Sequence, residues 1–314
     1  MYLYLSLVIP LLIFLVIYQI YRITKQFYHP HNPPFLRGEI PVGVDAEDMV
    51  PIEGYDTKRG GKGVSVKVRS WMPETKNGNA ILFIHGWESS MGYFKDHIRH
   101  YLSQGFLVIG VDGVSHGESD YCDILSLVNM ADSIETARKW MLSKYKVNKV
   151  VLWGHSLGGV GSTIGVGTGL IGKIDTLVIE GIFSDSQYII KRYLNSSPLP
   201  NLISKSFLWM MRKVFLSTLP KGHRMKNLKD LSVFNPSYQL ENIHVPYILV
   251  HAVGDHVVSY SEFEEMIKVK NPLLVPISLE KGNHFTTQDY PGYFERIDSA
   301  LNNALSVNPT LHST

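Results

Sequence analysis

The stretch from Lys149 to Gly159 constrains the fold more than any other part of the chain. It opens with an apolar run at residues 150–153, typical of a buried strand, and a helix of small residues follows. Between them lies Gly-His-Ser-Leu-Gly, with Ser156 at its centre. So sharp a turn from strand to helix holds the serine in a strained backbone conformation with its hydroxyl exposed. Because the turn packs tightly, we expect that only glycine fits at positions 154 and 158.

The chain on either side of this stretch alternates between strand and helix patterns. Residues 46–56 and 64–72 resemble a strand pair joined by a turn at 58–63. Further on, apolar runs predict strands at 80–84, 106–111, 150–153, 176–180, 247–250 and 274–279, and helices are predicted at 91–103, 127–144, 261–269 and 290–304. This alternation predicts an α/β fold with a mostly parallel sheet covered by helices on both faces.

The composition is typical of a globular protein. The chain has 314 residues, of which 45% are hydrophobic and 18% charged, which is enough apolar material for a large core. The net charge of +2 gives no general indication of a nucleic-acid partner. Cys122 is the single cysteine, so an intrachain disulfide is excluded.

Residues 1–21 contain no charged side chain, and as a helix they would span roughly 31 Å, enough to cross a bilayer core. A cleaved signal peptide would need a basic segment before the apolar run and small residues after it, and neither is present. We therefore predict an uncleaved transmembrane anchor. Basic residues follow the span, which places the rest of the chain on the cytoplasmic side, although one glycosylation sequon at Asn195 points the other way.

Beyond the anchor we expect a proline-rich linker at 22–45, an α/β domain at 46–306 and a tail at 307–314. The strand pattern is interrupted at 187–242, which we interpret as an inserted cap with an amphipathic helix at 203–219. Residues 187–230 carry nine Lys or Arg and one Asp, a local charge of +8. This basic segment is either an ordinary solvated face or a surface that rests on an anionic membrane beside the anchor.

A serine hydroxyl needs a general base to become a nucleophile, and the base needs an acid to orient it. In a parallel sheet such groups lie on loops at the carboxyl ends of strands. Asp255 follows the strand at 247–250, and His284 follows the strand at 274–279. We therefore expect Ser156, Asp255 and His284 to act together as nucleophile, acid and base.

Other residues compete for two of these roles. Glu180 ends a predicted strand and is an alternative acid. His251 and His256 are alternative bases, although both lie beside Asp255 rather than on a separate loop. The reaction also needs donors for the developing oxyanion, for which we expect the backbone N–H groups of Leu157 and Trp87.

The motifs together resemble the α/β-hydrolase superfamily of serine esterases, lipases and thioesterases, in particular membrane-anchored members with a short helical cap. They are His85-Gly86-Trp87, Asp112-Gly-Val-Ser-His116-Gly117-Glu-Ser119, the segment around Ser156, Asp255 and His284. Where many relatives carry Arg-Gly before His116, this chain has Val114-Ser115, which puts a contact made by that arginine in doubt.

The resemblance implies an α/β-hydrolase fold and a membrane-anchored serine hydrolase that cleaves carboxylic, lipid-like acyl esters without a cofactor or metal. An acyl-thioesterase is the alternative activity, and a non-catalytic scaffold on the same fold is an alternative from another class. The partners expected are a small or lipid-like ester and a membrane, with no nucleic acid. Gly167–Gly172 matches a dinucleotide-binding pattern but follows a helix instead of a strand, and His97 and His100 lack a metal-binding motif.

Overall fold

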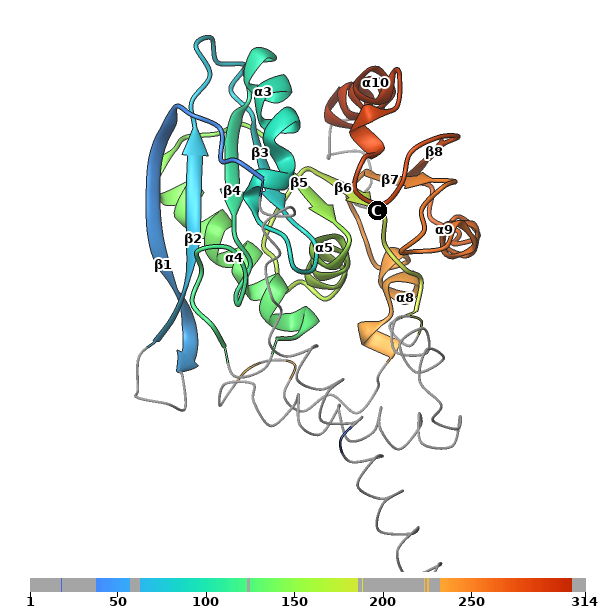
Figure 1. Cartoon of the computed structure of the whole chain (residues 1–314), viewed down its shortest axis with the longest axis horizontal. Helices are drawn as coiled ribbons and strands as arrows, with labels where there is room; N and C mark the ends of the chain where they lie inside the picture. Colours follow the sequence, from blue (N-terminus) through green and yellow to red (C-terminus); the bar gives the residue numbers. More distant parts are fainter. Residues whose placement is uncertain are drawn as a thin grey trace, which may run out of the picture.

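The computed structural model of this chain contains one sheet of eight strands (Figure 1). It describes residues 18, 38–56, 63–122, 125–185, 188, 223, 225 and 232–306. The strands are β1 (Val44–Asp56), β2 (Gly63–Trp71), β3 (Ala80–Ile84), β4 (Leu107–Val111), β5 (Val150–His155), β6 (Thr176–Glu180), β7 (Tyr247–Ala252) and β8 (Leu274–Leu279). The α-helices are α3 (Lys95–Ser103), α4 (Leu127–Lys144), α5 (Leu157–Gly167), α8 (Pro236–Leu240), α9 (Tyr260–Met266) and α10 (Tyr293–Ser306).

The strand order is β1-β2-β4-β3-β5-β6-β7-β8. The first two strands are antiparallel to each other, and β2 is antiparallel to β4. From β4 to β8 every neighbouring pair is parallel, which confirms the predicted mostly parallel sheet. The carboxyl ends of these parallel strands share one edge, so the loops that follow β3, β5, β7 and β8 meet there.

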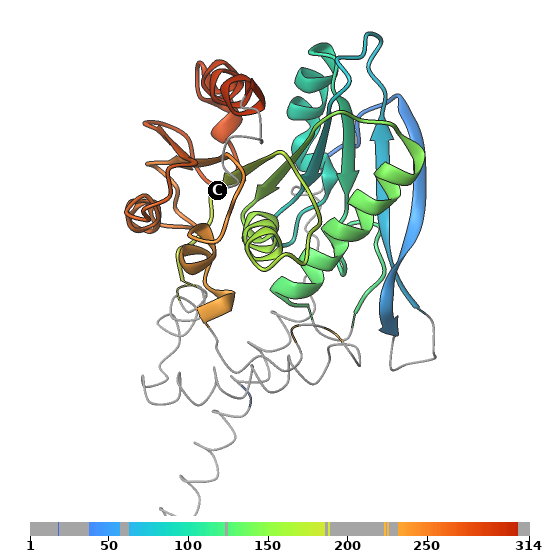
Figure 2. The same cartoon turned by 180° about the vertical axis from the view of Figure 1, so that it is seen from behind.

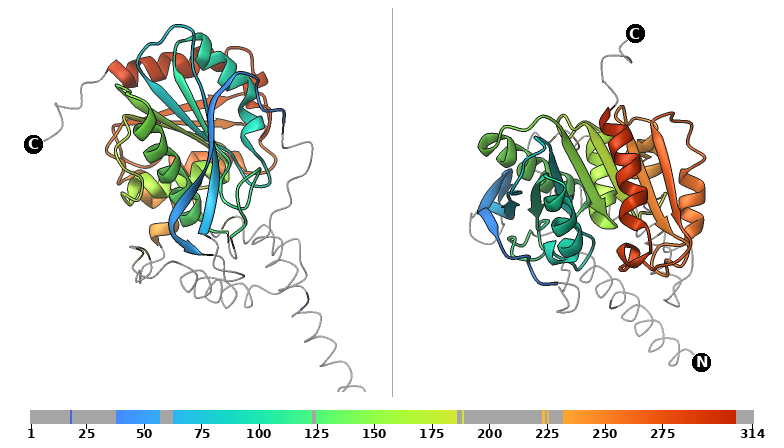
Figure 3. Two further views of the ribbon diagram at one scale, coloured as in Figure 1. Left: turned by 90° about the vertical axis from the view of Figure 1, so that its left-hand side faces the viewer. Right: turned by 90° about the horizontal axis from the view of Figure 1, so that it is seen from above.

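Helices cover both faces of the sheet, also as predicted. On one face, α3 and α10 lie against the sheet (Figure 3). Their apolar side chains are buried there in one cluster with side chains of the strands. The opposite face is covered by α4, α5, α8 and α9. In the reverse view α4 runs in front of the strands, with α5 beside it (Figure 2). The apolar contacts fall into one large cluster on each face, which is the arrangement of an α/β domain with a three-layer core.

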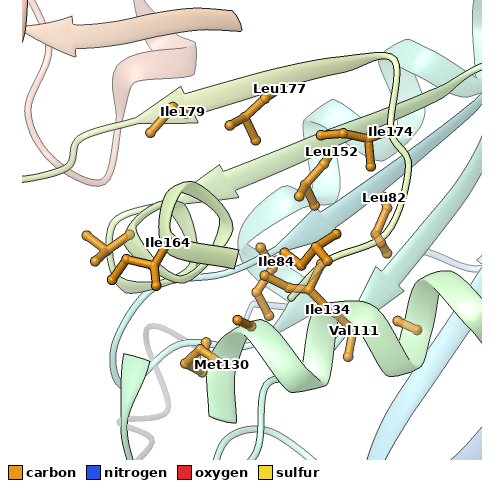
Figure 4. Close-up of a cluster of buried hydrophobic side chains, with 14 of the residues drawn as sticks. Leu82, Ile84, Val111, Met130, Ile134, Leu152, Ile164, Ile174, Leu177 and Ile179 are labelled. Carbon is orange, nitrogen blue, oxygen red and sulfur yellow. The ribbon is translucent and has the colours of Figure 1, made fainter. Parts of the chain in front are cut away.

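Central strands are apolar on both sides because both faces are buried. In β3, Leu82 and Ile84 point toward Met130 and Ile134 of α4 (Figure 4). The alternate side chains of the same strand enter the cluster beneath α3 and α10. This explains why the sequence of β3 is an uninterrupted apolar run and does not alternate between apolar and polar residues.

Some elements differ from the prediction. The expected helix at 91–103 begins as a 3₁₀ turn at Met91–Phe94, and the last helix begins at Tyr293 after a 3₁₀ turn at Thr287–Asp289. Helix α8 was not predicted; it lies within the range assigned to the cap and packs against α5. It is too short for its periodicity to be read from sequence. Strand β1 begins slightly ahead of the predicted domain boundary.

Among the residues that the structure describes, no helix is long and apolar enough to cross a membrane. The predicted anchor at 1–21 lies outside the described residues, Tyr18 excepted, as do the basic residues of the predicted cap.

Candidate active site

The turn between β5 and α5 holds Ser156 in an unusual backbone conformation. Ser156 has φ 51° and ψ −119°, in a region that non-glycine residues rarely adopt and that costs about 1–3 kcal/mol. Two backbone hydrogen bonds hold it there: its N–H donates to Glu180 O at 2.8 Å, and its carbonyl accepts from Val160 N–H at 2.9 Å. The strained turn predicted from the sequence is therefore present.

The glycines on either side are required by packing. A Cβ added at Gly154 would lie 2.6 Å from the Cα of Gly159. One added at Gly158 would lie 2.4 Å from the carbonyl oxygen of His85 and 2.6 Å from that of Ile84. These neighbours are backbone atoms of α5, of the end of strand β3 and of the residue after it, and they cannot rotate away, so the expectation for both glycines is confirmed.

We predict that Gly158→Ala destabilises the fold by about 3 kcal/mol or more, because the added methyl group forces two packed backbone segments apart. Urea unfolding followed by circular dichroism would measure the change. The control is Gly63→Ala, where the nearest atom to an added Cβ is Tyr55 O at 3.9 Å, and a change within about 0.5 kcal/mol is expected. Equal stability of the two variants would contradict the packing argument.

The three residues expected to act together lie within hydrogen-bonding distance. Nε2 of His284 is 2.9 Å from Oγ of Ser156, and Nδ1 is 2.7 Å from Oδ2 of Asp255. A carboxylate can only accept, so Nδ1 carries the proton and the lone pair of Nε2 faces the serine hydroxyl. His284 is 2% exposed and Asp255 8% exposed, while Ser156 is half-buried at the edge of the sheet. The serine is thus within reach of a base in the correct tautomer.

Asp255 is held in its charged form. Burial raises the pKa of this carboxyl, but the hydrogen bond from His284 and that from Val258 N–H outweigh it, and the net pKa lies below its ordinary value. Its other oxygen, Oδ1, accepts from the N–H groups of Val257 and Val258, both at 2.8 Å. The carboxylate is therefore fixed in orientation and able to stabilise a positive charge on His284.

The alternative acid, Glu180, faces other partners. Its carboxylate accepts hydrogen bonds from the hydroxyls of Thr287 and Tyr293 and from the indole of Trp153. Burial raises the pKa of Glu180 in spite of these donors. The position that orients His284 is occupied by Asp255 instead.

The two alternative bases also have different surroundings. His251 is buried beneath the loop that carries Asp255. Its Nε2 donates to Val258 O at 3.0 Å, so it supports this loop. His256 is exposed and lies beside the ring of Phe285. The geometry places His284, rather than either of these, against Ser156.

The turn after β3 lies directly against the serine. A Cβ at Gly86 would lie 2.9 Å from the Cβ of Ser156. His85 fixes this turn: its Nδ1 donates to Gly86 O at 2.7 Å, and its Nε2 accepts from Gly113 N–H at 3.0 Å. Burial lowers the pKa of His85 to about 4, so the ring is neutral and can accept at neutral pH. Trp87 follows in this turn and Leu157 opens α5, which puts both expected oxyanion donors on segments next to Ser156.

The loop after β4 shows a pairing that the sequence did not reveal. Asp112 accepts from the N–H groups of Met91 and Glu118 and lies 3.4 Å from Nη1 of Arg69. Arg69 comes from β2, the strand next to β4, so an arginine distant in sequence contacts the aspartate even though Val114-Ser115 replaces the family's usual Arg-Gly. Only knowledge that β2 pairs with β4 could have indicated the contact between Arg69 and Asp112.

The remaining motifs have structural partners. Nε2 of His97 lies 2.9 Å from Tyr293 OH, whereas Nε2 of His100 lies 2.8 Å from Asp298 Oδ2. No group of three or more potential metal ligands occurs in the described part of the chain. Gly167 is the last residue of α5, so the glycine pattern lies at a helix carboxyl end, where backbone carbonyls rather than N–H groups point outward.

Comparisons with known proteins agree with this architecture. The profile of the alpha/beta hydrolase family matches residues 81–297. The chain is 23% identical over 244 residues to protein phosphatase methylesterase 1 from Candida albicans, covering 71% of this chain and 68% of that protein. Its fold is similar to that of an esterase from Pyrococcus furiosus, with 17% identity, a TM-score of 0.62 and coverage of 89% of this chain and 99% of that one. A proline iminopeptidase from Mycobacterium smegmatis is similar over 84% of this chain and 100% of its own, with 14% identity and a TM-score of 0.55.

Proposed function

Since the chain belongs to the alpha/beta hydrolase family, we propose that it is a serine hydrolase that cleaves carboxylic esters. The observation that carries this proposal is the hydrogen-bonded series from Ser156 through His284 to Asp255, set at a strained turn between strand and helix. A nucleophile, a base and an orienting acid in this arrangement are what acyl transfer requires.

In the proposed reaction, Oγ of Ser156 attacks the ester carbonyl while Nε2 of His284 takes the hydroxyl proton. The carbonyl oxygen becomes an oxyanion that accepts hydrogen bonds from the N–H groups of Leu157 and Trp87. The tetrahedral intermediate then loses the alkoxide, which receives the proton from His284 and leaves as an alcohol. Water, deprotonated by the same imidazole, attacks the acyl-serine, and the acid is released with Ser156 restored. Asp255 stabilises the imidazolium in both halves of the reaction.

The choice of esters is supported by relatives. The Candida albicans relative is named as a methylesterase and the Pyrococcus furiosus protein as an esterase. The uncharged segment at 1–21 and the basic segment at 187–230 support a lipid-like acyl ester that is met at a membrane surface. A thioester would react by the same steps, so a panel of ester and thioester substrates with matched acyl chains decides between them.

A fluorophosphonate probe, which reacts only with an activated serine, tests the proposal. Full-length wild type should be labelled, and Ser156→Ala and His284→Ala should not. If folded wild type is not labelled, or if labelling persists in Ser156→Ala, the proposed nucleophile is wrong. A folded wild type that hydrolyses neither esters nor thioesters would favour the non-catalytic scaffold.

A pair of variants separates the two candidate acids. We predict that Asp255→Asn lowers kcat by about 10³- to 10⁴-fold, because an amide N–H in place of Oδ2 favours the wrong tautomer of His284. Glu180→Gln keeps an acceptor for Thr287 and Tyr293, and we predict a kcat within about fivefold of wild type. Steady-state kinetics on the best ester measures both. A larger loss of kcat in Glu180→Gln than in Asp255→Asn would show that Glu180, rather than Asp255, is the acid.

We also propose that residues 1–21 anchor the chain in a membrane with the α/β domain on the cytoplasmic side. The absence of charge in this segment and the basic residues that follow it support this orientation. In sealed, right-side-out vesicles the domain should resist added protease until detergent is present. Digestion from outside would overturn the orientation, and release of the chain by alkaline carbonate would overturn the anchor.

A further inference from the structure

His155 stands next to Ser156 in the sequence but has no part in the reaction described above. Its ring is buried, with 2% of the residue exposed. Nε2 of His155 lies 2.8 Å from the main-chain carbonyl oxygen of His284. A carbonyl oxygen can only accept, so Nε2 carries the proton and donates this hydrogen bond.

The surroundings of the ring keep it in this state. It stacks on Tyr93 with 4.3 Å between ring centroids and lies 4.8 Å from the ring of His284. Its Nδ1 is buried and has no hydrogen-bond partner within the described ranges. Burial, together with the neighbouring His284, holds the pKa of His155 well below its ordinary value. The ring is therefore a neutral donor whose tautomer does not change over the working pH range.

Two consecutive residues thus hold His284 at two different atoms. His155 binds the backbone carbonyl of His284, and the hydroxyl of Ser156 lies 2.9 Å from its Nε2. Asp255 accepts a hydrogen bond from a third atom of His284, its Nδ1. Because the two attachments come from adjacent residues, the last of strand β5 and the first of the turn that follows it, the backbone of the loop that carries His284 and the nucleophile cannot shift independently.

We propose that His155 is a positioning residue, whose donated hydrogen bond fixes the backbone of His284 so that the imidazole stays aligned between Asp255 and Ser156. The inference rests on the proposed serine hydrolase function and extends it to a residue that does not touch substrate. A displacement of about 1 Å between reacting groups can cost about 10²-fold in rate, so a loss of this size follows from release of the loop.

Three variants test the role of the donor. His155→Leu removes the donor and keeps an apolar side chain. His155→Gln places an amide N–H near the position of Nε2, while in His155→Asn the amide ends near the position of Nδ1 and falls short of the carbonyl. We expect kcat to fall about 10- to 100-fold in the leucine and asparagine variants with KM within about threefold, and to return to within about threefold of wild type in the glutamine variant.

A spectroscopic readout that needs no substrate accompanies the kinetics. The proton between Nδ1 of His284 and Asp255 should give a low-field NMR resonance that disappears in Asp255→Asn. It should be present in wild type and His155→Gln and be lost or broadened in His155→Leu. If the leucine variant does not fold, the asparagine variant carries the same expectation.

Wild-type kcat and an unchanged resonance in the variants without the donor would overturn the inference. An equal loss in the glutamine variant would also overturn it, since bulk rather than the donor would then matter. A wild type that the fluorophosphonate does not label would contradict the proposed function, while the resonance would still report on the positioning of His284.

Discussion

Ser156→Ala is expected to lower kcat for the best ester by about 10⁴- to 10⁶-fold, and His284→Ala by a similar factor. In the proposed mechanism the two side chains act as one unit, because the hydroxyl is a poor nucleophile until Nε2 of His284, 2.9 Å away, removes its proton. The double variant should therefore be no slower than either single variant. Activity that remains would come from the oxyanion donors and from substrate binding alone.

Steady-state kinetics on purified full-length chain measures the three variants side by side. Urea unfolding serves as the control, and Ser156→Ala should differ from wild type by about 1 kcal/mol or less, since the hydroxyl is removed from a half-buried site. Losses that multiply in the double variant would show that the serine and the histidine act separately. A single variant that keeps a tenth of wild-type activity would exclude the proposed mechanism.

The second large effect is a loss of stability in mild acid. Five histidines are buried, and each has a pKa below the ordinary value chiefly because burial disfavours the charged ring. They are His85, His97, His116, His155 and His251. The pKa is about 4 for His85 and about 3 for both His97 and His116. These rings stay neutral in the folded chain at a pH where the unfolded chain takes up protons.

The sign of the effect follows from this difference. Above a pH of about 6.5 the histidines are neutral in both states and contribute nothing to the pH dependence. Below it the unfolded chain binds protons that the folded chain does not. Each histidine then lowers the free energy of unfolding by up to about 1.4 kcal/mol per pH unit, until the pH approaches its pKa in the folded chain. Burial raises the pKa of Asp112 and Glu180, which acts in the opposite direction and offsets part of the loss.

His85, His97 and His116, whose pKa values lie at about 3 to 4, together contribute a loss of about 4 kcal/mol per pH unit between about pH 6 and pH 5. His155 and His251 act in the same direction, and the two carboxyls offset part of the loss. Urea unfolding at pH 7.5, 6.5, 5.5 and 4.5 measures it. His97→Phe, in a site surrounded by aromatic rings, should flatten the curve by about 1.4 kcal/mol per pH unit. His244→Asn, at an exposed position, is the control and should leave the slope unchanged. Constant stability from pH 7 to pH 5 would contradict the prediction.

Much of this protein could be predicted from local sequence patterns. The strands at 80–84, 176–180 and 274–279 and the helix at 127–144 have the predicted bounds, because turn residues interrupt each apolar run. The glycines at 154 and 158 could also be predicted, since a sharp turn from strand to helix leaves no room for a Cβ. The proximity of Ser156, Asp255 and His284 could be predicted because each follows a predicted parallel strand, and such strands end at one edge.

Contacts between distant segments were decided only by the tertiary structure. The order of the strands places Arg69 of β2 against Asp112 in the loop after β4, although 42 residues with no shared pattern separate them. Asp255 rather than Glu180 orients His284, because the hydroxyls of Thr287 and Tyr293 face Glu180 instead. The bond from His155 to the carbonyl of His284 joins residues 129 positions apart. Sequence periodicity reports which side chains are buried, whereas hydrogen-bond partners depend on how the loops meet in space, and this is settled only when the sheet has formed.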